Sequence, residues 1–272
     1  MKIFVVGLML LLWYDDGSGA FERSAVGARG AAMGGALVAA AGNEWTAMVN
    51  PGALQTVGRR TLALFYAPQP FEMKELAFGA AVYVEPTSLG TFAVGASRFG
   101  FELYHETRCV LSYAREVTAG VRLGVNLVYY TLSIRNYGSA SSFGIDLGVL
   151  VDVADGVRWG FSALNPNGAR IGAAREKLPQ VFSTGVGWVP VSGVEFLAGV
   201  TKDVRFPAEV HAGVEYTMFD VLAVRAGTTS EPGMLHAGVG VKAAFARFDY
   251  AFSSHSELGN THQISVSLVL GD

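Results

Sequence analysis

The sequence predicts an all-β fold: a transmembrane antiparallel β-barrel of about fourteen strands, preceded by an amino-terminal plug. Three observations indicate this fold. Side-chain character alternates with a period of two from about residue 74 to the carboxyl end, the chain is apolar without containing a membrane helix, and short connections alternate with long ones between the predicted strands.

The alternation is clearest in the last segment, where apolar and polar side chains occupy opposite parities. The apolar positions are Ile264, Val266, Leu268 and Leu270, and the polar ones are Gln263, Ser265 and Ser267. A period of two places the sets on opposite faces of a strand. The same split recurs over residues 143–152 and 209–218. Because the polar parity is mostly Gly, Ser and Ala, we expect one face in lipid and the other in a crowded lumen.

The composition supports a membrane protein. The 272 residues are 51% hydrophobic and 16% charged, with a mean hydropathy of +0.34. No internal stretch reaches the roughly 18 consecutive apolar residues of a membrane helix, so the apolar excess must be distributed over strands. Cys109 is the only cysteine, which excludes an intrachain disulfide and a cysteine metal cluster.

The first 20 residues have the features of a signal peptide. Lys2 precedes an apolar run over residues 3–13, and small residues follow at 18–20. Its removal takes away Lys2, Asp15 and Asp16 and changes the formal net charge from −3 to −2. A charge this small predicts no nucleic acid partner. We therefore expect export to the bacterial outer membrane, with lipid as a partner.

Residues 21–58 are rich in Gly and Ala and lack sustained alternation, so we expect a plug or hatch inside one mouth of the barrel. The candidate gating residues are Trp45, Met48, Asn50, Pro51, Gly52 and Leu54. The run Asn50-Pro51-Gly52 is the predicted pivot, because it stops a short helix and contains a flexible glycine. A gating role and a purely space-filling role are both open.

Residues 59–272 form the predicted barrel. The candidate strands are 59–66, 74–84, 90–99, 106–116, 121–135, 141–153, 157–164, 180–190, 194–202, 208–218, 221–228, 234–242, 244–253 and 261–270. The connections after 116, 153, 190 and 218 are short, which is typical of periplasmic turns. This orientation places Trp159, Trp188 and Tyr216 near the periplasmic ends of outward faces, where an aromatic belt is expected.

Two stretches carry a resemblance to a known family. The run Arg29–Ala39 with Asn50–Leu54, and the carboxyl-terminal runs Phe248–Phe252 and Glu257–Ser265, resemble the ends of PorV/PorQ-type barrels, relatives of the FadL transporters. The resemblance implies a fourteen-stranded, FadL-like outer-membrane barrel with an amino-terminal hatch. PorV-like members serve type IX secretion, whereas FadL relatives pass hydrophobic molecules through a lumen and out by a lateral opening.

From this resemblance we predict a non-enzymatic component of protein export or surface assembly, with secretion proteins or exported cargo as partners. A FadL-like channel for a hydrophobic small molecule is the alternative, and a purely structural barrel is a third. Nucleophile-elbow, phosphate-loop and dinucleotide motifs are missing from the sequence, so we expect neither catalysis nor a cofactor.

Charged residues and histidines on the predicted lumen face form a candidate polar ladder. Its members are Arg108, Asp146, Arg158, Glu209, His211, Glu215, Arg225, His236, Lys242, Arg247 and Asp249. The histidines do not follow metal-ligand spacing, so no metal site is predicted. Cross-strand ion pairs that rigidify the wall and a polar binding path are both open interpretations.

Overall fold

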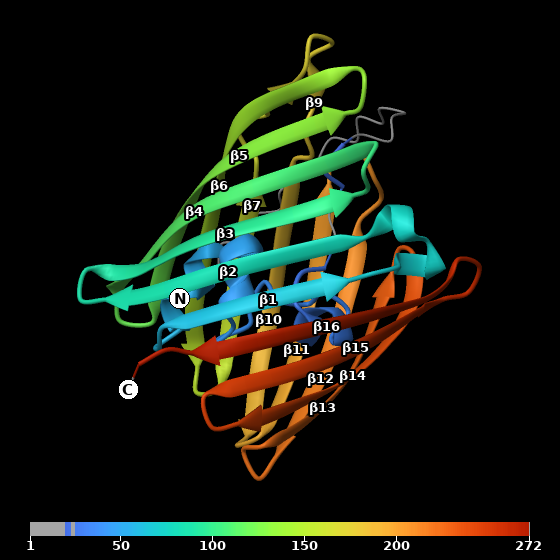
Figure 1. The fold of residues 1–272 in the computed structure, drawn as a ribbon. Coiled ribbons are helices and arrows are strands. Elements are labelled where there is room, and N and C mark those ends of the chain that lie inside the picture. The colour runs from blue at the N-terminus through green and yellow to red at the C-terminus, as the bar shows by residue number, and fades with distance from the viewer. Residues whose placement is uncertain (1–19, 23–24, 272) are drawn as a thin grey trace.

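The computed structural model describes residues 20–22 and 25–271, so the predicted signal peptide lies outside them except for Ala20. Within these residues fourteen antiparallel strands close into a barrel through the pairing of the first with the last (Figure 1), which confirms the predicted fold class. The barrel strands are β1 (Thr61–Ala67), β2 (Phe78–Thr87), β3 (Gly90–Gly100), β4 (Tyr104–Thr118), β5 (Val121–Ile134), β6 (Gly138–Ala154), β7 (Val157–Leu164), β10 (Val181–Val191), β11 (Val194–Asp203), β12 (Glu209–Met218), β13 (Leu222–Ser230), β14 (Gly233–Ala243), β15 (Ala246–His255) and β16 (Gly259–Val269).

The predicted strand at 74–84 begins later than expected, at Phe78. The preceding residues form two short 3₁₀ turns, η3 (Pro70–Glu72) and η4 (Lys74–Leu76). Pro70 fixes the start of the first turn, and Phe71 and Glu72 adopt positive φ values of 53° and 65°, which reverse the chain direction. Lys74 therefore lies in a connection rather than in the sheet.

The two ends of the barrel differ in their connections. At the turn end, which also holds the start of β1 and the end of β16, the strands are joined by tight turns such as Asp155–Gly156 and Ser192–Gly193. At the opposite loop end the connections vary in length, from the two residues 231–232 to the longest one, which covers residues 165–180.

The outward face of the barrel is apolar along its length. Ile145, Leu147 and Val149 project outward from β6, and 47% of Leu147 is exposed. Cys109 on β4 is also exposed on this face. Near the turn end the Trp188 ring stacks on Phe196, with ring centroids 5.6 Å apart. An apolar band with aromatic residues at its edge is the surface that a bilayer requires.

The inward face has two chemically different halves. On β1–β5 apolar side chains predominate, with polar ones at Thr61, Thr91, Glu106, Ser112 and Asn126, whereas on β10–β16 the inward side chains are mostly polar. The sequence predicts a lumen face of mostly Gly, Ser and Ala and does not separate these two halves. Buried inward residues of the first half include Ala63, Phe65, Phe78, Ala80, Val82, Val84, Val110 and Val128. Those of the second half include Ser183, Thr201, His211, Glu215, Arg225, Asp249, Ser253, Gln263, Ser265 and Ser267.

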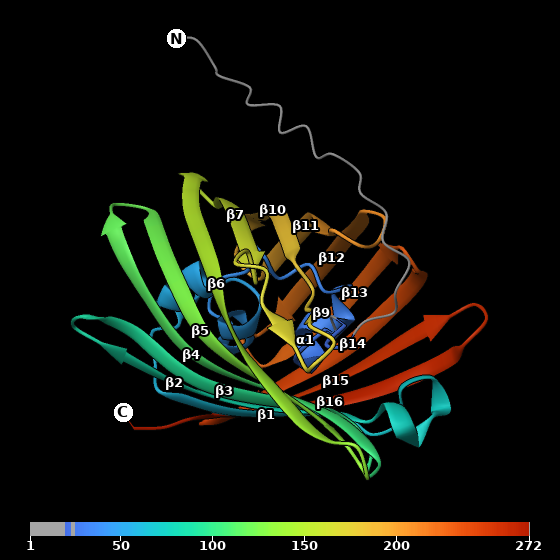
Figure 2. The same cartoon turned by 90° about the horizontal axis from the view of Figure 1, so that it is seen from above.

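Residues 25–57, which we call the amino-terminal segment, lie inside the ring of strands (Figure 2). The segment contains α1 (Ala28–Ala32), η1 (Glu44–Met48) and η2 (Pro51–Thr56). Asn43 caps η1 by accepting a hydrogen bond of 2.8 Å from the Trp45 amide, and Asn50 caps η2 by accepting one of 3.0 Å from the Gly52 amide. None of the helices in the described residues has the length and apolar character needed to span a bilayer.

Cross-strand glycines let the amino-terminal segment approach the wall backbone. Gly124 and Gly148 are register partners on β5 and β6, and Pro51 and Gly52 lie against them. A Cβ at Gly52 would lie 2.8 Å from the backbone of Gly148, which is closer than real Cβ contacts. Glycines also face the segment at two further patches, Gly160 and Gly185 under Val38, and Gly213 and Gly227 under Met33. The backbone of the segment thus rests directly on the wall from β5 to β13.

The wall pairing is incomplete at the loop end of β6. Strand β7 ends at Leu164 opposite Asp146, so residues 138–145 of β6 have no ladder partner on that side. Residues 165–180 bend inward at this place and carry a small hairpin of β8 (Arg170–Ile171) and β9 (Glu176–Lys177), which lies across the barrel mouth (Figure 2). Ile171 and Leu178 of this stretch are buried in the same apolar cluster as the inner wall.

Candidate functional site

A cavity of about 90 Å³ lies at the loop end, between the amino-terminal segment and the inner wall. Its lining is largely apolar, with aromatic rings on two sides. The apolar lining residues are Phe21, Val26, Met48, Val49, Phe78, Phe99, Leu164, Pro179 and Val181. The Phe21 ring meets the Tyr130 ring edge-on at 5.0 Å between centroids. An apolar cavity of similar order, about 150 Å³, holds a single benzene ring in another protein.

Two of the three charged residues that line the cavity already have partners. The Glu106 carboxylate accepts hydrogen bonds from the Tyr104 hydroxyl at 2.5 Å and from the Phe21 amide at 2.7 Å. The Arg108 guanidinium pairs with Asp146 at 2.6 Å. Glu22 stands exposed at the rim, and it is the one charged lining residue for which the described residues supply no partner. The rim therefore carries negative charge.

Asp146 joins three parts of the molecule beneath the cavity. Besides Arg108, its carboxylate accepts hydrogen bonds from the Asn126 side chain at 3.1 Å and from the Asn165 amide at 3.0 Å. Asn126 also donates to the Ala47 carbonyl of the amino-terminal segment at 2.8 Å. Asp146 is fully buried. It therefore ties the wall to the segment and to the inward loop.

A second group of charges joins the amino-terminal segment to the polar half of the wall. Arg29 binds Glu215 through two bonds of 2.8 Å and Glu195 through one of 2.6 Å. Glu44, also in the segment, accepts a bond of 2.7 Å from Arg247. The remaining pairs lie within the wall: Arg158 with Glu195, Arg225 with Glu215, Arg225 with Asp249, and Arg247 with Asp249. We call these eight residues the ion network.

The ion network is electrically balanced, because four arginines face four carboxylates. Each charge pairs with at least one partner of opposite sign, so burial leaves none of them uncompensated. Because Arg29 and Glu44 of the segment pair with wall residues, the network holds the segment in place against β11–β15. The network includes five members of the predicted ladder: Arg158, Glu215, Arg225, Arg247 and Asp249. Two further members, Arg108 and Asp146, pair with each other below the cavity.

The other predicted ladder residues lie apart from the ion network. The His211 ring is 2.6 Å from the Gly34 carbonyl and 3.3 Å from Glu209, and the His236 ring is 2.8 Å from the Ser253 hydroxyl. Lys242 is exposed at the turn end, and no described residue forms an ion pair with it. Among the described residues no group of three His, Cys, Asp or Glu is placed to hold a metal ion.

The predicted gating residues form the contact surface of the segment. Trp45 is buried, with its ring 6.0 Å from that of Phe65, and the Leu54 side chain is fully buried. Met48 lines the cavity. The Asn50 side chain donates to the carbonyls of Val38 at 2.6 Å and Val149 at 2.9 Å, so it connects the segment to itself and to β6.

Sequence reasoning missed the two charges that the segment itself supplies, Arg29 and Glu44. An isolated charge in a Gly- and Ala-rich stretch is a signal that could have indicated them, because burial of that stretch requires a partner for each. Glu195 was missed as well, although it has the inward parity of β11.

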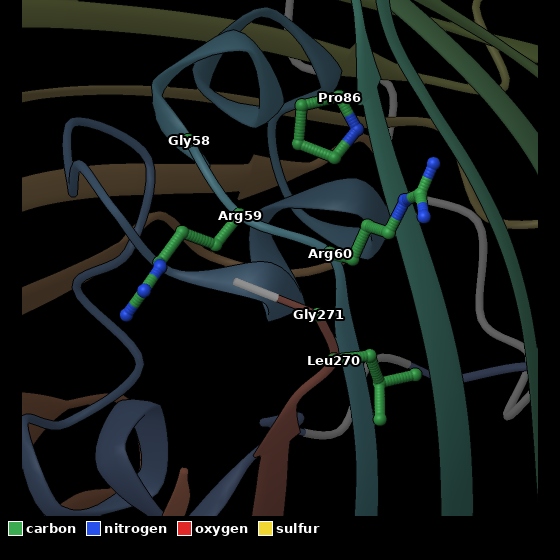
Figure 3. A pocket seen from close by; sticks show the side chains of 6 residues that line it. All are labelled: Gly58, Arg59, Arg60, Pro86, Leu270 and Gly271. Atoms are coloured by element: carbon green, nitrogen blue, oxygen red, sulfur yellow. The ribbon is translucent and has the colours of Figure 1, made fainter. Parts of the chain in front are cut away.

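A hollow of about 340 Å³ lies at the turn end, where the amino-terminal segment enters β1. It is lined by Gly58, Arg59, Arg60, Pro86, Leu270 and Gly271. Figure 3 shows the Arg59 and Arg60 side chains directed away from each other, with Pro86 and Leu270 on neighbouring strand ends. Arg60 pairs with Glu85 at 2.7 Å. The hollow is therefore a rim feature rather than a closed chamber.

Solved structures with the same architecture are outer-membrane channels. The Pseudomonas putida toluene transporter TodX superposes with a TM-score of 0.64 at 13% identity, over 90% of this chain and 99% of that one. The CymD monoaromatic hydrocarbon channel gives 0.68 at 14% identity, over 91% and 98%. A Pseudomonas aeruginosa FadL homologue gives 0.67 at 12% identity, over 93% and 100%. The chain has a FadL-like fold. No protein-family model and no curated protein matches the sequence.

These likenesses correct the function predicted first. The prediction of a PorV/PorQ-type component of type IX secretion is wrong, because the structures that share this fold are FadL-type channels for hydrophobic small molecules. They favour the alternative that the sequence left open. The similar structures are also channels rather than enzymes.

Proposed function

We propose that this protein is an outer-membrane channel that admits a small, uncharged hydrophobic molecule from the loop end of the barrel. The observation that carries the proposal is the loop-end cavity, which is largely apolar, has a volume of about 90 Å³ and lies against the amino-terminal segment. The likeness in fold to hydrocarbon channels supports the same reading.

The charges around the cavity favour a neutral ligand. Arg108 is occupied by Asp146, and Glu106 is occupied by Tyr104 and Phe21, so the described lining residues offer no free cation to a carboxylate ligand. Glu22 at the rim repels an anion. Burying a ligand charge without a partner is costly, so an aromatic hydrocarbon should enter more readily than its carboxylate analogue.

The amino-terminal segment then serves as the plug, because it stands across the lumen below the cavity. Besides its chain connection to β1, two kinds of non-covalent contact hold it against the wall, the glycine patches and the ion network. The proposal thus has two further parts. The amino-terminal segment is the plug of the channel, and the protein lies in the outer membrane after its signal peptide is removed.

Binding to the purified full chain in detergent tests the proposal. Titration with toluene and with benzoate, followed by calorimetry, compares a neutral ring with its charged analogue. We expect saturable toluene binding and benzoate binding that is weaker by about tenfold or more, equivalent to about 1.4 kcal/mol. Equal affinity for both, or binding of neither, would contradict the proposal.

A pair of valine variants locates the binding. Val181 is buried in the cavity wall, so Val181→Trp should fill the cavity and lower toluene affinity by about tenfold. Val153, at the turn end of β6, is 63% exposed and lines neither hollow, so Val153→Trp adds the same bulk away from the cavity. Toluene binding that survives Val181→Trp unchanged would place the ligand elsewhere.

A further inference from the structure

The amino-terminal segment is attached to the wall unevenly. From β3 to β16 it is held by backbone contacts at glycines, by the ion network, and by hydrogen bonds such as those from the Thr91 amide to the Gln55 side chain at 3.2 Å and from the Ala28 amide to the Ser265 hydroxyl at 2.7 Å. Between the described residues 25–57 and strands β1 and β2, no hydrogen bond or ion pair is formed. Only side-chain packing joins them there.

The packing on this side consists of apolar side chains that can move past one another. The Phe65 ring lies between Trp45 at 6.0 Å and Phe78 at 5.8 Å, measured between ring centroids. Such contacts are non-directional, whereas ion pairs and backbone contacts fix a single geometry. We call this apolar contact between the segment and strands β1 and β2 the seam. If the segment shifts, the seam can open without breaking a hydrogen bond or an ion pair.

The same side of the barrel interior lies between the two hollows of the molecule. Phe78, at the start of β2, lines the loop-end cavity, and Pro86, near the end of β2, lines the turn-end hollow. The inward residues between them on β2 are Ala80, Val82 and Val84, all buried and apolar. At the lower end Val57 is buried in the same cluster, and the next residue, Gly58, already belongs to the turn-end hollow.

We propose that the transported molecule passes along the inner faces of β1 and β2, between Trp45 of the segment and the Phe78–Phe65 ring pair, from the loop-end cavity to the turn-end hollow. The segment stays fastened to β3–β16, and only its side-chain contacts with β1 and β2 part as the molecule passes. The route takes neutral molecules of ring size, because the inward side chains of β2 from Phe78 to Val84 are all apolar. This inference rests on the proposed function and names the path through the same site.

Two alanine positions give a matched test. Ala80 on β2 and Ala223 on β13 both point inward, and both are 8% exposed. Ala80→Trp places a large ring in the seam, whereas Ala223→Trp places it on the fastened side. Toluene uptake is measured in Gram-negative cells that have an intact lipopolysaccharide leaflet, lack their own hydrophobic channel and express the full chain.

We expect Ala80→Trp to lower uptake about tenfold, whereas Ala223→Trp keeps it within roughly twofold of wild type. The reverse order, or equal loss in both variants, would overturn the route. Calorimetry then measures toluene binding to each purified variant. If Ala80→Trp blocks the path but leaves the cavity intact, it should lose uptake and keep saturable binding. Loss of both would indicate that the cavity itself was disrupted.

A measurement on the unaltered chain avoids any folding defect of the variants. An uncharged phenyl diazirine, photolysed with the wild-type barrel in lipid, labels the residues that it visits. We expect labels on β1, β2 and Trp45 that are suppressed by excess toluene. Labels confined to residues 165–180 and the neighbouring ends of β6 and β10 would show a sideways exit and refute the route. A wild-type chain with neither saturable labelling nor uptake would instead refute the proposed function itself.

Discussion

The Arg108 guanidinium and the Asp146 carboxylate form an ion pair of 2.6 Å inside the barrel, and no part of Asp146 is exposed. Asp146→Ala should therefore leave Arg108 buried without its counter-charge. We expect a loss of about 3–5 kcal/mol in the free energy of unfolding. Urea unfolding of the barrel in lipid vesicles, followed by tryptophan fluorescence, measures it.

Asp152 provides the control for this prediction. It also pairs with an arginine, Arg122, at 2.8 Å, but its side chain is 41% exposed. Asp152→Ala should cost no more than about 1 kcal/mol, because a solvated pair gains little. Similar losses of unfolding free energy in the two variants would show that burial of the Asp146–Arg108 pair is not the cause of the destabilisation.

Gly52→Ala should destabilise the seating of the amino-terminal segment. The added methyl would meet the backbone of Gly148 and Val149 at 2.8 Å, and a strand backbone cannot give way as a flexible side chain can. We expect a cost of about 1–3 kcal/mol and faster proteolysis within residues 25–57. Gly58→Ala is the matched control, since no atom lies within 4 Å of its added methyl. A neutral Gly52→Ala would argue against backbone contact at this patch.

Arg29→Lys should loosen the segment although it preserves the charge. The guanidinium binds both oxygens of Glu215 and reaches Glu195 at the same time, and an ammonium group cannot reproduce this fork. We expect a loss of about 1.5–3 kcal/mol in unfolding free energy. A double-mutant cycle with Glu215→Gln should give a coupling of about 0.5–3 kcal/mol, and a coupling of zero would exclude a direct pair.

Leu147→Arg tests whether the outward face contacts lipid. Leu147 projects outward near the middle of the paired length of β6, where an arginine would cost about 2–4 kcal/mol in the bilayer midplane. Val153→Arg, at the turn end of the same strand, should cost about 0–1 kcal/mol. The two variants are compared by reversible unfolding from vesicles. A protein that tolerates both substitutions equally does not expose this face to hydrocarbon.

The barrel could be predicted from the sequence because the alternation of side chains within most strands shows which face is apolar and which is polar. In β16 and β12 the apolar and polar parities are distinct, and the turns between strands carry Gly, Asp or Asn at the expected places. Strand β1 is different: Leu62 and Leu64 face out while Ala63 and Phe65 face in, so both parities are apolar. Such a strand does not reveal that its inner face packs on a plug, and the apolar half of the lumen could not be foreseen.

The ladder residues were identified from parity alone, but their partners were not. Arg225 and Asp249 are on neighbouring inner faces only because β13, β14 and β15 pair in a particular register. Arg29 and Glu44 come from a segment without periodicity, so nothing local connects them to residues more than 150 positions away. The loop-end cavity likewise depends on the inward bend of residues 165–180, for which the sequence predicts only a long connection.

Cys109 makes this barrel convenient to study by spectroscopy. It is the single thiol of the sequence, it sits on the outward face of β4, and none of the sites discussed above uses it. A nitroxide or fluorophore attached there would report the depth and fluidity of the surrounding acyl chains without prior removal of any native cysteine. The wild-type protein thus carries its own attachment point for a membrane probe.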